Sequence, residues 1–516
     1  MKNIVVVGGG TAGWITALYA KKHFPSDNVT VVESSEIGIL GAGEGSTPQL
    51  IDVLDFLEIP LSTFIEKTKT TIKNGIKFTN WSQNTPYYYH GFGISDNIVN
   101  DFNINSTLSP FAFPKISISR LLNISKENNL DDYDILQIAS DNNKVLFQHN
   151  RGINQNKILD FDQLGKFSIH FDARSFAEML SEIGISRGIN QIDAIVNKIN
   201  SSSDGSIESI DLDNSQNIAT DFIFDCTGFA RLFIGKHFNE NWISYSKHLP
   251  AKKAIPFFLD IDKDNIPPYT ESIAMNYGWM WKIPLQHRYG CGYVYDSDFI
   301  SDEDAKKEIE RYLGFIPNYP RENPFNFNPG SFENIRIKNC LAVGLSSNFI
   351  EPLEATSIFN SIYVLDIFFQ NKNNIFNNDE KITKRFNEQS LEYSKNIMNF
   401  IYLHYITNKT NTDFWFNFTK NNVIPEKLEN IIYIMNNGIL KDEDVGNSFS
   451  SSSYYTVANG NEVLNLQNIK NICNINNFNI FDNFIQIDSQ LKKDRKKFLM
   501  SHSNFLKYMG GLKEIK

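Results

Sequence analysis

Three glycines near the N-terminus have a spacing that can bind a phosphate. Gly8, Gly10 and Gly13 follow the β-branched run 4–7 and precede the apolar stretch 15–20, which is typical of a helix. In such a turn the first glycine bends the chain, the second lets the backbone approach a pyrophosphate, and the third allows close helix packing. The unpaired N–H groups at the helix start would face the phosphate. The pattern predicts a dinucleotide site.

An acidic residue follows where a ribose would be bound. The apolar strand 29–32 ends at Glu33, about 20 residues beyond the glycines, the separation expected for a carboxylate that binds ribose hydroxyls. A chance glycine turn is the alternative, and the strand, helix and acid together favour the dinucleotide site. Gly43, Glu44 and Gly45 then lie in a glycine-dense loop, where backbone can approach a flat or phosphorylated group; a mobile loop is the alternative.

Two lysines are candidates for a reactive amine. Lys73 and Lys77 lie in the run 71–81, whose alternation is typical of a half-buried strand. They have the same parity, so alternation places both on one face. A solvated strand face is the ordinary interpretation of such charges. A desolvated lysine would instead have a lowered pKa and could donate to a polarised oxygen.

Two tryptophans and two glutamates complete the candidates. Trp279 and Trp281 stand two residues apart in a strand-like stretch, so both face one side, as core aromatics or as the wall of a site. Glu351 and Glu354 precede the helical pattern 359–369. Either could act as a general base, or could stabilise a helix N-terminus as first-turn carboxylates often do. Chemistry alone does not choose between the two glutamates.

The elements that position these residues alternate between strands and helices. Apolar strands at 3–7, 29–33 and 221–226 each lead into a turn, and 173–186 has a helical pattern. This is the pattern of a doubly wound α/β sheet, in which 221–226 gives a third approach to the dinucleotide, although any core strand would look similar. The aromatic-rich strands between 255 and 295 predict a separate β layer.

Length, charge and cysteine content limit the class of protein. A chain of 516 residues can bury a large core, and a net charge of −10 argues against nucleic acid as a partner. The basic run 492–497 is expected to be a solvated helix face. The 4 cysteines form no CxxC pair, so we expect neither disulfides nor a metal site, and a cytoplasmic location. No apolar stretch approaches the ~20 residues of a membrane span, and no signal peptide is recognised.

In chain order, these motifs resemble those of the flavin-dependent tryptophan halogenases. The Trp-x-Trp-x-Ile-Pro stretch, which distinguishes that family from flavin hydroxylases, is the most specific of them. The resemblance fades beyond about residue 420. It rests on Gly8–Trp14, Gly43–Gly45, Lys73, His170–Asp172, Trp279–Pro284, Gly344–Ile358 and Asp413–Trp415.

The resemblance implies an FAD-binding Rossmann-like box of the flavin monooxygenase type, with a second, mixed β and helical substrate layer. It also implies a two-component reaction. A separate NAD(P)H-dependent flavin reductase supplies FADH2, oxygen forms a flavin hydroperoxide, and halide attack on its distal oxygen makes hypohalous acid. That acid travels through a tunnel to an organic substrate, because it would otherwise oxidise anything nearby.

The same resemblance predicts the division of the chain. A halogenase core would span 1–420, and a divergent, mainly helical region, 421–516, would cover the substrate site. Within the core, the dinucleotide-binding parts would be about 1–55, 168–235 and 335–370, and the substrate layer about 70–165 and 250–330.

Residue roles follow from the register of the motifs. Lys73, rather than Lys77, falls on the lysine that holds the oxidant or is halogenated by it. Glu354, rather than Glu351, falls on the glutamate that orients the oxidant or takes the ring proton, so Lys73 and Glu354 should point into one cavity. FAD would be bound by Gly8, Gly10, Thr11, Ala12, Gly13, Glu33, Gly43, Glu44, Gly45, Leu345 and Ile358.

The halide would be bound by the backbone N–H groups of Thr356 and Ser357, at a helix start. Where the family reads Ser-Thr-Gly, this chain reads Ala355-Thr356-Ser357. The lost glycine alters the expected halide pocket, so the choice among chloride, bromide and iodide stays open.

The substrate side departs from the family. His90 and Phe92 fall where the indole ring is sandwiched, and Trp279 and Trp281 would separate the flavin from the tunnel. The usual partner segment, Phe-Trp followed by Gly-Asn-Tyr-Tyr, is missing, and 448–477 contains no tryptophan. We therefore expect an electron-rich indole- or phenol-like substrate rather than free tryptophan.

Two other functions remain as alternatives. One is a flavin-dependent aromatic hydroxylase, against which Lys73 and the tryptophan pair count. The other is a flavin-binding protein without halogenation, against which Glu354 also counts. At the level of the family, a homo-oligomer is expected.

Overall fold

The structure, a computed structural model, describes residues 1–37, 43–92, 135–149, 161–163, 165–371, 379–421, 423–475 and 499–512. The chain divides into two compact units, each assembled from three separate stretches. The first unit comprises Met1–Thr70, Phe171–Leu249 and Phe327–Lys395, and the second comprises Thr71–His170, Pro250–Asn326 and Asn396–Lys516. The sequence-based boundary near residue 420 stays a prediction.

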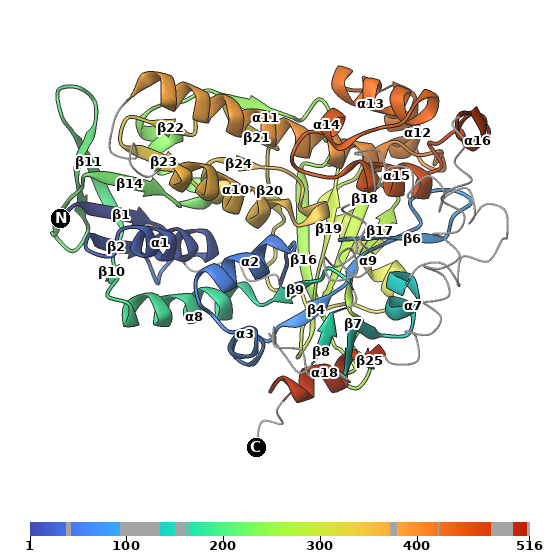
Figure 1. The fold of residues 1–516 in the computed structure, drawn as a ribbon, viewed down its shortest axis with the longest axis horizontal. Coiled ribbons are helices and arrows are strands. Elements are labelled where there is room, and N and C mark those ends of the chain that lie inside the picture. The colour runs from blue at the N-terminus through green and yellow to red at the C-terminus, as the bar shows by residue number, and fades with distance from the viewer. Residues whose placement is uncertain are drawn as a thin grey trace. The chain divides into compact units, whose positions relative to one another are not determined.

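A six-stranded sheet forms the centre of the first unit (Figure 1). Its strands are parallel except for the edge strand β22, which pairs antiparallel with β23. The middle strands are buried on both faces, which explains why they read as continuous apolar runs. The fold class is the mixed α/β class expected from the sequence. In sheet order the strands are β10 (Asn190–Asp193), β2 (Asn28–Glu33), β1 (Asn3–Val7), β14 (Phe222–Asp225), β23 (Cys340–Ala342) and β22 (Arg336–Ile337).

Helices pack on this sheet. The first, α1 (Thr11–His23), contacts β1 and β2 as well as α8 (Ala173–Ser186) and α10 (Thr356–Gln370). The long helix α11 (Glu380–Tyr405) begins in this unit and ends in the second. The other elements of the first unit are β3 (Glu44–Gly45), α2 (Gln49–Phe56), α3 (Leu61–Lys67), β11 (Val196–Ser201), β12 (Ile207–Leu212), β13 (Asn217–Ala219), η2 (Gly228–Ala230), η3 (Leu232–His237), β15 (Trp242–Ser244), β21 (Gly330–Phe332), η4 (Gly344–Ser346), β24 (Asn348–Phe349) and η5 (Pro352–Glu354).

A seven-stranded sheet dominates the second unit. All its neighbouring strands are antiparallel except β17 and β5, which run parallel. One face packs against α9 (Asp302–Leu313) around Phe257, Met280 and Tyr293. This sheet is the separate β layer predicted for 255–295. In order its strands are β20 (Phe325–Asn326), β16 (Lys253–Leu259), β19 (Tyr289–Tyr295), β18 (Gly278–Pro284), β17 (Tyr269–Met275), β5 (Gly75–Thr79) and β6 (Tyr87–Gly91).

The expected single strand over 71–81 is wrong. It is two strands, β4 (Thr71–Lys73) and β5, interrupted at Asn74. The N–H of Asn74 donates to the carbonyl of Pro268 instead of continuing either ladder. β4 pairs with β9 (Ser168–Phe171), whereas β5 pairs with β6 and β17. The alternation that would place Lys73 and Lys77 on one face therefore does not continue across Asn74.

Within its described residues, the C-terminal part of the second unit is mainly helical and contributes a single strand. β25 (Leu499–Ser501) pairs antiparallel with β7 (Lys144–His149), which also pairs with β8 (Phe161–Gln163). The helices described there are α12 (Asp413–Asn421), α13 (Glu426–Asn437), α14 (Asp442–Val445), α15 (Ser451–Gly460), α16 (Leu466–Ile475) and α18 (His502–Tyr508), while α7 (Ile135–Asp141) belongs to the first stretch of this unit.

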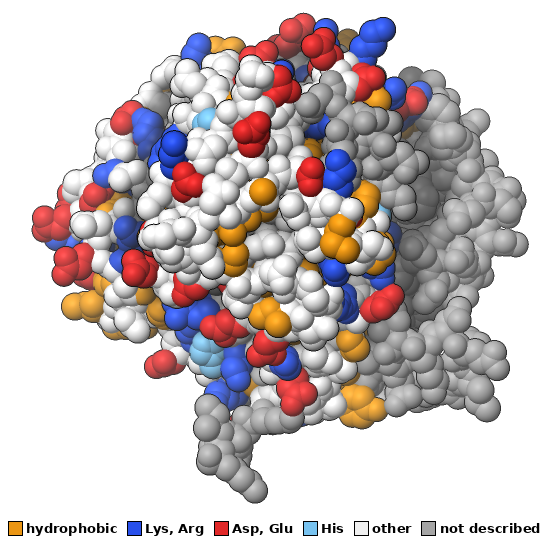
Figure 2. All heavy atoms as spheres, turned by 90° about the vertical axis from the view of Figure 1, so that its left-hand side faces the viewer, with side chains coloured by type: hydrophobic (Ala, Val, Ile, Leu, Met, Phe, Trp, Pro, Cys, Tyr) orange, Lys and Arg blue, Asp and Glu red, His pale blue; other side chains and the backbone are white. Residues whose placement is uncertain are grey.

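Charges are mixed over the surface. Figure 2 shows one face, on which acidic and basic side chains are interspersed over the part that the structure describes. The basic run 492–497 lies outside the described residues. Among the residues described, no helix is both long and apolar enough to cross a membrane.

Candidate functional site

The glycine turn of the first unit has the geometry that its sequence predicted. Gly8 has φ +120°, and a Cβ there would lie 2.1 Å from the carbonyl oxygen of Cys226. A Cβ on Gly13 would lie 1.8 Å from the carbonyl oxygen of Gly8. Gly10 differs, because nothing lies within 4 Å of its Cβ position. Gly8 and Gly13 thus allow close contact between backbone segments, whereas Gly10 borders open space.

That open space lies at the start of α1. Gly10 immediately precedes the helix, so Thr11 and Ala12 belong to the first turn, where backbone N–H groups have no partner within the helix. Gly344 (φ +73°) approaches this turn, because its Cβ position is 2.8 Å from the Cβ of Ala12. Leu345 follows in η4. The turns after β1 and β23 thus meet beside the space.

Glu33 also lies beside the turn. A Cβ on Gly9 would overlap the carboxylate of Glu33, at 1.3 Å from Oε2. The other oxygen, Oε1, accepts a hydrogen bond from Nε2 of Gln191. A free helix start with a carboxylate next to it suits a pyrophosphate and a ribose. The residues therefore fit an FAD, although the ribose would compete with Gln191.

The second glycine group is described from residue 43 onward; 38–42 lie outside the described residues. Gly43 has φ +78°, a conformation that favours glycine, and it precedes the short strand of Glu44 and Gly45. Burial, reinforced by the Asp172 carboxylate, raises the pKa of Glu44 to about 7. Glu44 is therefore partly protonated at neutral pH and can donate as well as accept.

The start of α10 holds the predicted halide residues. Ala355 precedes it with φ +57°, a left-handed conformation that costs a non-glycine residue about 1 kcal/mol or more. Such strain is common at functional sites. Thr356 and Ser357 supply the first N–H groups of a 15-residue helix, and Ile358 follows them, 8% exposed. An anion is stabilised at such a helix start.

Both candidate glutamates lie just before this helix. Glu354 ends η5 and is 2% exposed, while Glu351 is completely buried. Burial therefore does not choose between them, and the motif register remains the reason to select Glu354. The alternative, in which Glu354 is a first-turn carboxylate, applies to the short η5 and not to α10, because Glu354 lies within η5 and precedes Ala355 and α10.

Lys73 belongs to the second unit and is 1% exposed. Its Nζ lies 5.3 Å from the centroid of the Phe92 ring. Lysine is rarely buried to this extent, so its burial marks a functional candidate. Lys77, by contrast, lies among tyrosines, with Nζ 4.1 Å from the centroid of Tyr87 and 4.0 Å from Asp141. Geometry thus separates the two lysines that alternation could not.

A buried hydrogen-bond chain holds the strand of Lys73. The hydroxyl of Thr71 donates to the carbonyl of Pro284 (2.6 Å), so its oxygen must accept from Nδ1–H of His170 (2.9 Å). Nε2 of His170 then accepts from the hydroxyl of Thr270 (2.9 Å). Burial, with the nearby Lys73 charge, holds the pKa of His170 well below its usual value. Thr71 therefore ties β4 to Pro284, the last residue of the Trp-x-Trp-x-Ile-Pro stretch, and neutral His170 connects Thr71 to Thr270.

A second histidine from the C-terminal region binds the same strand. Nε2 of His502 accepts from the N–H of Ile72 (2.9 Å), and its Nδ1–H donates to the carbonyl of Ile266 (3.1 Å). Burial lowers the pKa of His502 to about 3. Sequence reasoning missed His502, because a lone histidine in a segment without family motifs has no local signal.

This pKa predicts a pH effect on stability. The unfolded chain binds a proton at His502 near pH 6.5, whereas the folded chain binds it only near pH 3. The stabilisation by neutral His502 is therefore complete above pH 6.5 and is lost as the pH falls toward 3, by about 1.4 kcal/mol per pH unit once the unfolded state is protonated.

We expect His502→Gln, whose amide oxygen can still accept from Ile72, to flatten this fall by about 1 kcal/mol per pH unit between pH 6 and 5. Urea unfolding of both proteins from pH 5 to 7.5 measures the difference. Equal slopes would show that His502 is not held neutral.

The two tryptophans face one side of β18. Trp279 is 1% exposed, and its ring centroid lies 6.2 Å from that of Trp281. Small residues stand opposite them, with Gly292 beside Trp281 and Ala274 beside Trp279. A Cβ on Gly292 would lie 2.0 Å from the Trp281 ring, so this glycine gives the indole its space. The pair forms a continuous aromatic surface, as a wall requires.

His90 lies in an aromatic cluster that the sequence did not reveal. It is 6% exposed, and its ring centroid lies 5.5 Å from Phe400 and 6.4 Å from Phe449. Phe400 and Phe449 stack at 3.9 Å, and Tyr454 adds an edge contact to Phe400. An aromatic segment after residue 445 therefore does accompany His90, without a tryptophan.

The chain is similar to known proteins in both sequence and structure. The family model for tryptophan halogenase matches residues 3–472. Among curated proteins, a tryptophan 7-halogenase of Kutzneria sp. is 29% identical over 80% of this chain and 78% of its own. A 7-chloro-L-tryptophan 6-halogenase of the same strain is 30% identical over 69% of this chain and 70% of its own. Among solved structures, a flavin-dependent halogenase from Xanthomonas campestris is 25% identical, covers 99% of this chain and 98% of its own, and gives a TM-score of 0.83.

Proposed function

The chain belongs to the tryptophan halogenase family and is a flavin-dependent halogenase, and from this premise we propose that it halogenates an electron-rich aromatic molecule other than free tryptophan. FAD, when bound and reduced, supplies the two electrons that combine with O2 to oxidise halide. Overall, Ar–H, halide, O2, FADH2 and a proton give Ar–X, FAD and two waters. A separate NAD(P)H-dependent reductase supplies the FADH2.

The flavin nucleotide is held by the first unit. Gly10, Thr11 and Ala12 bind the pyrophosphate through the start of α1, and Glu33 binds the ribose. The open space at Gly10 supports this assignment. The remaining cofactor residues in this proposal are Gly8, Gly13, Gly43, Glu44, Gly45, Leu345 and Ile358. Thr356 and Ser357 bind the halide through their backbone N–H groups.

Lys73 and Glu354 carry out the transfer to the ring. The ammonium of Lys73 donates to the oxygen of hypohalous acid and aims the halogen. The ring attacks the halogen, the O–X bond breaks with its electrons on oxygen, and that oxygen leaves as water after taking a proton from Lys73. Glu354 accepts the proton lost from the ring carbon, and its transfer through solvent restores Lys73.

The substrate contacts the aromatic residues of the second unit. His90, Phe92 and Phe449 offer ring faces and edges to an indole or a phenol. Trp279 and Trp281 exclude water and separate the flavin from the substrate tunnel. The absence of a tryptophan from 448–477 supports a substrate other than free tryptophan.

One observation carries the proposal most strongly, namely the burial of Lys73 against Phe92. Thr71, which accepts from neutral His170, also ties the strand of Lys73 to Pro284 at the end of the tryptophan-bearing strand, and this supports a fixed position for the amine.

The test is mass spectrometry of complete reactions. Protein, FAD, NADH and a flavin reductase are incubated with chloride, bromide or iodide and a panel of indoles and phenols that includes L-tryptophan. We expect the isotope pattern of one added halogen on at least one indole or phenol, and a faster reaction than with L-tryptophan. Catalase is present throughout, so that free peroxide does not produce the halogenation.

Three other outcomes of this experiment would each contradict a part of the proposal. Gain of one oxygen without halogen identifies an aromatic hydroxylase. A preference for L-tryptophan contradicts the proposed substrate class. Flavin oxidation that gives no product with any acceptor contradicts halogenation of this class of molecule.

A further inference from the structure

A polar cavity lies in the second unit, away from the strand of Lys73. Its volume is about 590 Å³, within the range of about 300 to 1,000 Å³ that small-molecule pockets occupy. Asn80, at the end of β5, is one of its walls, whereas Lys73 precedes the start of the same strand. Five residues of β5 separate the two ends by about 16 Å. The cavity is therefore not part of the proposed transfer site.

Two cations line this cavity. Nζ of Lys409 donates to the carbonyl of Asn80 (2.7 Å) and lies 5.8 Å from the centroid of the Trp415 ring. An ammonium has three donors, so two remain for a ligand. Arg311 comes from the last turn of α9. Within the part of the chain that the structure describes, neither cation forms an ion pair with a carboxylate.

The one carboxylate among the residues that line the cavity, Glu308, offsets only one of these two positive charges. Glu308 is 6% exposed, and each of its oxygens already accepts a hydrogen bond. Oε1 binds the N–H of Asn276 (2.8 Å), and Oε2 binds the hydroxyl of Tyr293 (2.9 Å). The cavity thus keeps a local excess of positive charge in a chain whose net charge is −10.

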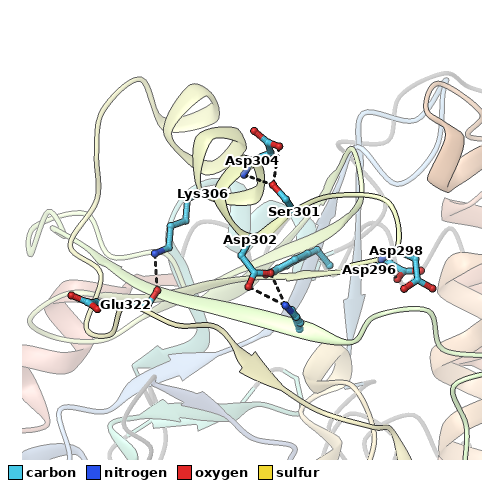
Figure 3. Close-up of polar contacts among 9 residues, drawn as sticks. Asp296, Asp298, Ser301, Asp302, Asp304, Lys306 and Glu322 are labelled. Atoms are coloured by element: carbon cyan, nitrogen blue, oxygen red, sulfur yellow. Dashed lines mark hydrogen bonds and ion pairs between the residues drawn. The ribbon is translucent and has the colours of Figure 1, made fainter.

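The charged residues at the start of α9 differ from Arg311 at its end. Nζ of Lys253 donates to both carboxylate oxygens of Asp302. Figure 3 shows Ser301 capping the helix at Asp304 and Lys306 donating to the carbonyl of Glu322. Charges at the start of the helix are thus satisfied within the protein. Arg311 at its end is exposed, and within the described residues its charge acts on Asp304 without forming an ion pair with it.

The walls of the cavity are fixed by contacts between three loops. The N–H of Gln83 donates to Asn408 Oδ1 (2.9 Å), and its side chain donates to Thr410 (3.2 Å). The hydroxyl of Thr412 donates to the carbonyl of Asn276 (2.7 Å). A site held in this way loses little entropy when a ligand binds.

We propose that this cavity binds a small molecule through an oxyanion group, a carboxylate or a phosphate. Arg311 donates in pairs to two oxygens of the group, and Lys409 contributes a point charge with two free donors. Tyr312 offers a ring face to the rest of the molecule, and Asn80 and Asn276 add amide contacts. Burial lowers the pKa of Lys409, an effect that a bound anion would reverse. This binding does not depend on halogenase activity.

Calorimetric titration of the full-length protein tests the proposal. Succinate and inorganic phosphate are titrated separately at pH 7 in a low-chloride Tris buffer, with neutral succinamide as the uncharged comparison. We expect at least one anion to bind with a Kd below about 1 mM, to weaken as NaCl is added, and succinamide not to bind. Which anion binds distinguishes a carboxylate ligand from a phosphate ligand.

Two variants and a matched control locate the binding. Arg311→Gln changes an exposed side chain and should weaken the anion at least tenfold, and the double variant with Lys409→Gln should abolish binding. The control, Lys306→Gln with Lys307→Gln, removes two positive charges from the same helix outside the cavity and should change the Kd less than twofold. Failure of both anions to bind, or equal weakening in the control, overturns the proposal.

Discussion

Lys73→Met protein binds FAD as tightly as the wild type but forms at least about 100-fold less halogenated product, equivalent to about 2.7 kcal/mol of transition-state stabilisation. The reason is that methionine fills the space of the buried lysine without its ammonium, so the oxidant is neither held nor aimed. Flavin oxidation continues, because it does not need the amine. Product is measured by mass spectrometry, and flavin oxidation by absorbance under the same conditions.

Lys77→Met is the matched control. It removes an identical charge four residues away, from a lysine that contacts Tyr87 and Asp141 instead of Phe92. We expect its halogenation rate to stay within about threefold of the wild type, as for a change that misses the reacting atoms. If Lys73→Met still halogenates the same ring position, or if both variants lose activity equally, the role assigned to Lys73 is wrong.

Gly13→Ala and Gly10→Ala both weaken FAD binding, but only Gly13→Ala is expected to disrupt folding. At Gly13 the new methyl would lie 1.8 Å from the carbonyl of Gly8, so α1 cannot pack on β1. We expect a loss of about 3 kcal/mol or more of unfolding free energy and no FAD binding. At Gly10 the backbone is extended (φ −77°) and nothing lies within 4 Å, so the apoprotein should fold with unchanged or slightly higher stability.

The Gly10 variant tests the cofactor directly. Its methyl enters the space where the pyrophosphate would approach α1, so FAD affinity should fall at least tenfold, about 1.4 kcal/mol. Denaturant unfolding of the apoprotein and flavin fluorescence titration separate the two effects. An unchanged FAD affinity in Gly10→Ala would show that the phosphates are not bound at this turn.

Features built from consecutive residues could be predicted. The glycine turn after β1 has the expected conformation, and α8 spans 173–186 as its pattern indicated. Asp172 caps that helix by accepting from the N–H of Ser175 (3.1 Å), another local interaction. Periodicity, capping and positive φ act within a few residues, so neighbouring sequence contains the information.

Local sequence patterns could not decide which of the two candidate lysines, Lys73 or Lys77, is buried. Alternation put Lys73 and Lys77 on one face because it assumed one strand, and the interruption at Asn74 places them in different sheets. Only the family motif had selected Lys73. The structure gives an independent physical reason, since Lys73 alone of the two is buried against Phe92.

The surroundings of these residues depend on distant parts of the chain. Phe400 and Phe449 stack beside His90 although hundreds of residues separate them from it, and His502 binds the strand of Lys73 from the C-terminal region. No spacing rule connects such positions, because their contacts depend on how the strands pair and how the helices pack. Sequence analysis therefore found no aromatic partner for His90.

The sequence by itself determined the glycine turn after β1, the α/β class and the family motifs, because each depends on neighbouring residues whose propensities act locally. Tertiary structure decided which lysine is buried and which protonation state His170 and His502 hold. It also decided that Arg311 and Lys409 line one cavity. Burial and hydrogen-bond partners come from residues brought together by folding, and they set the electrostatic free energy of each charge.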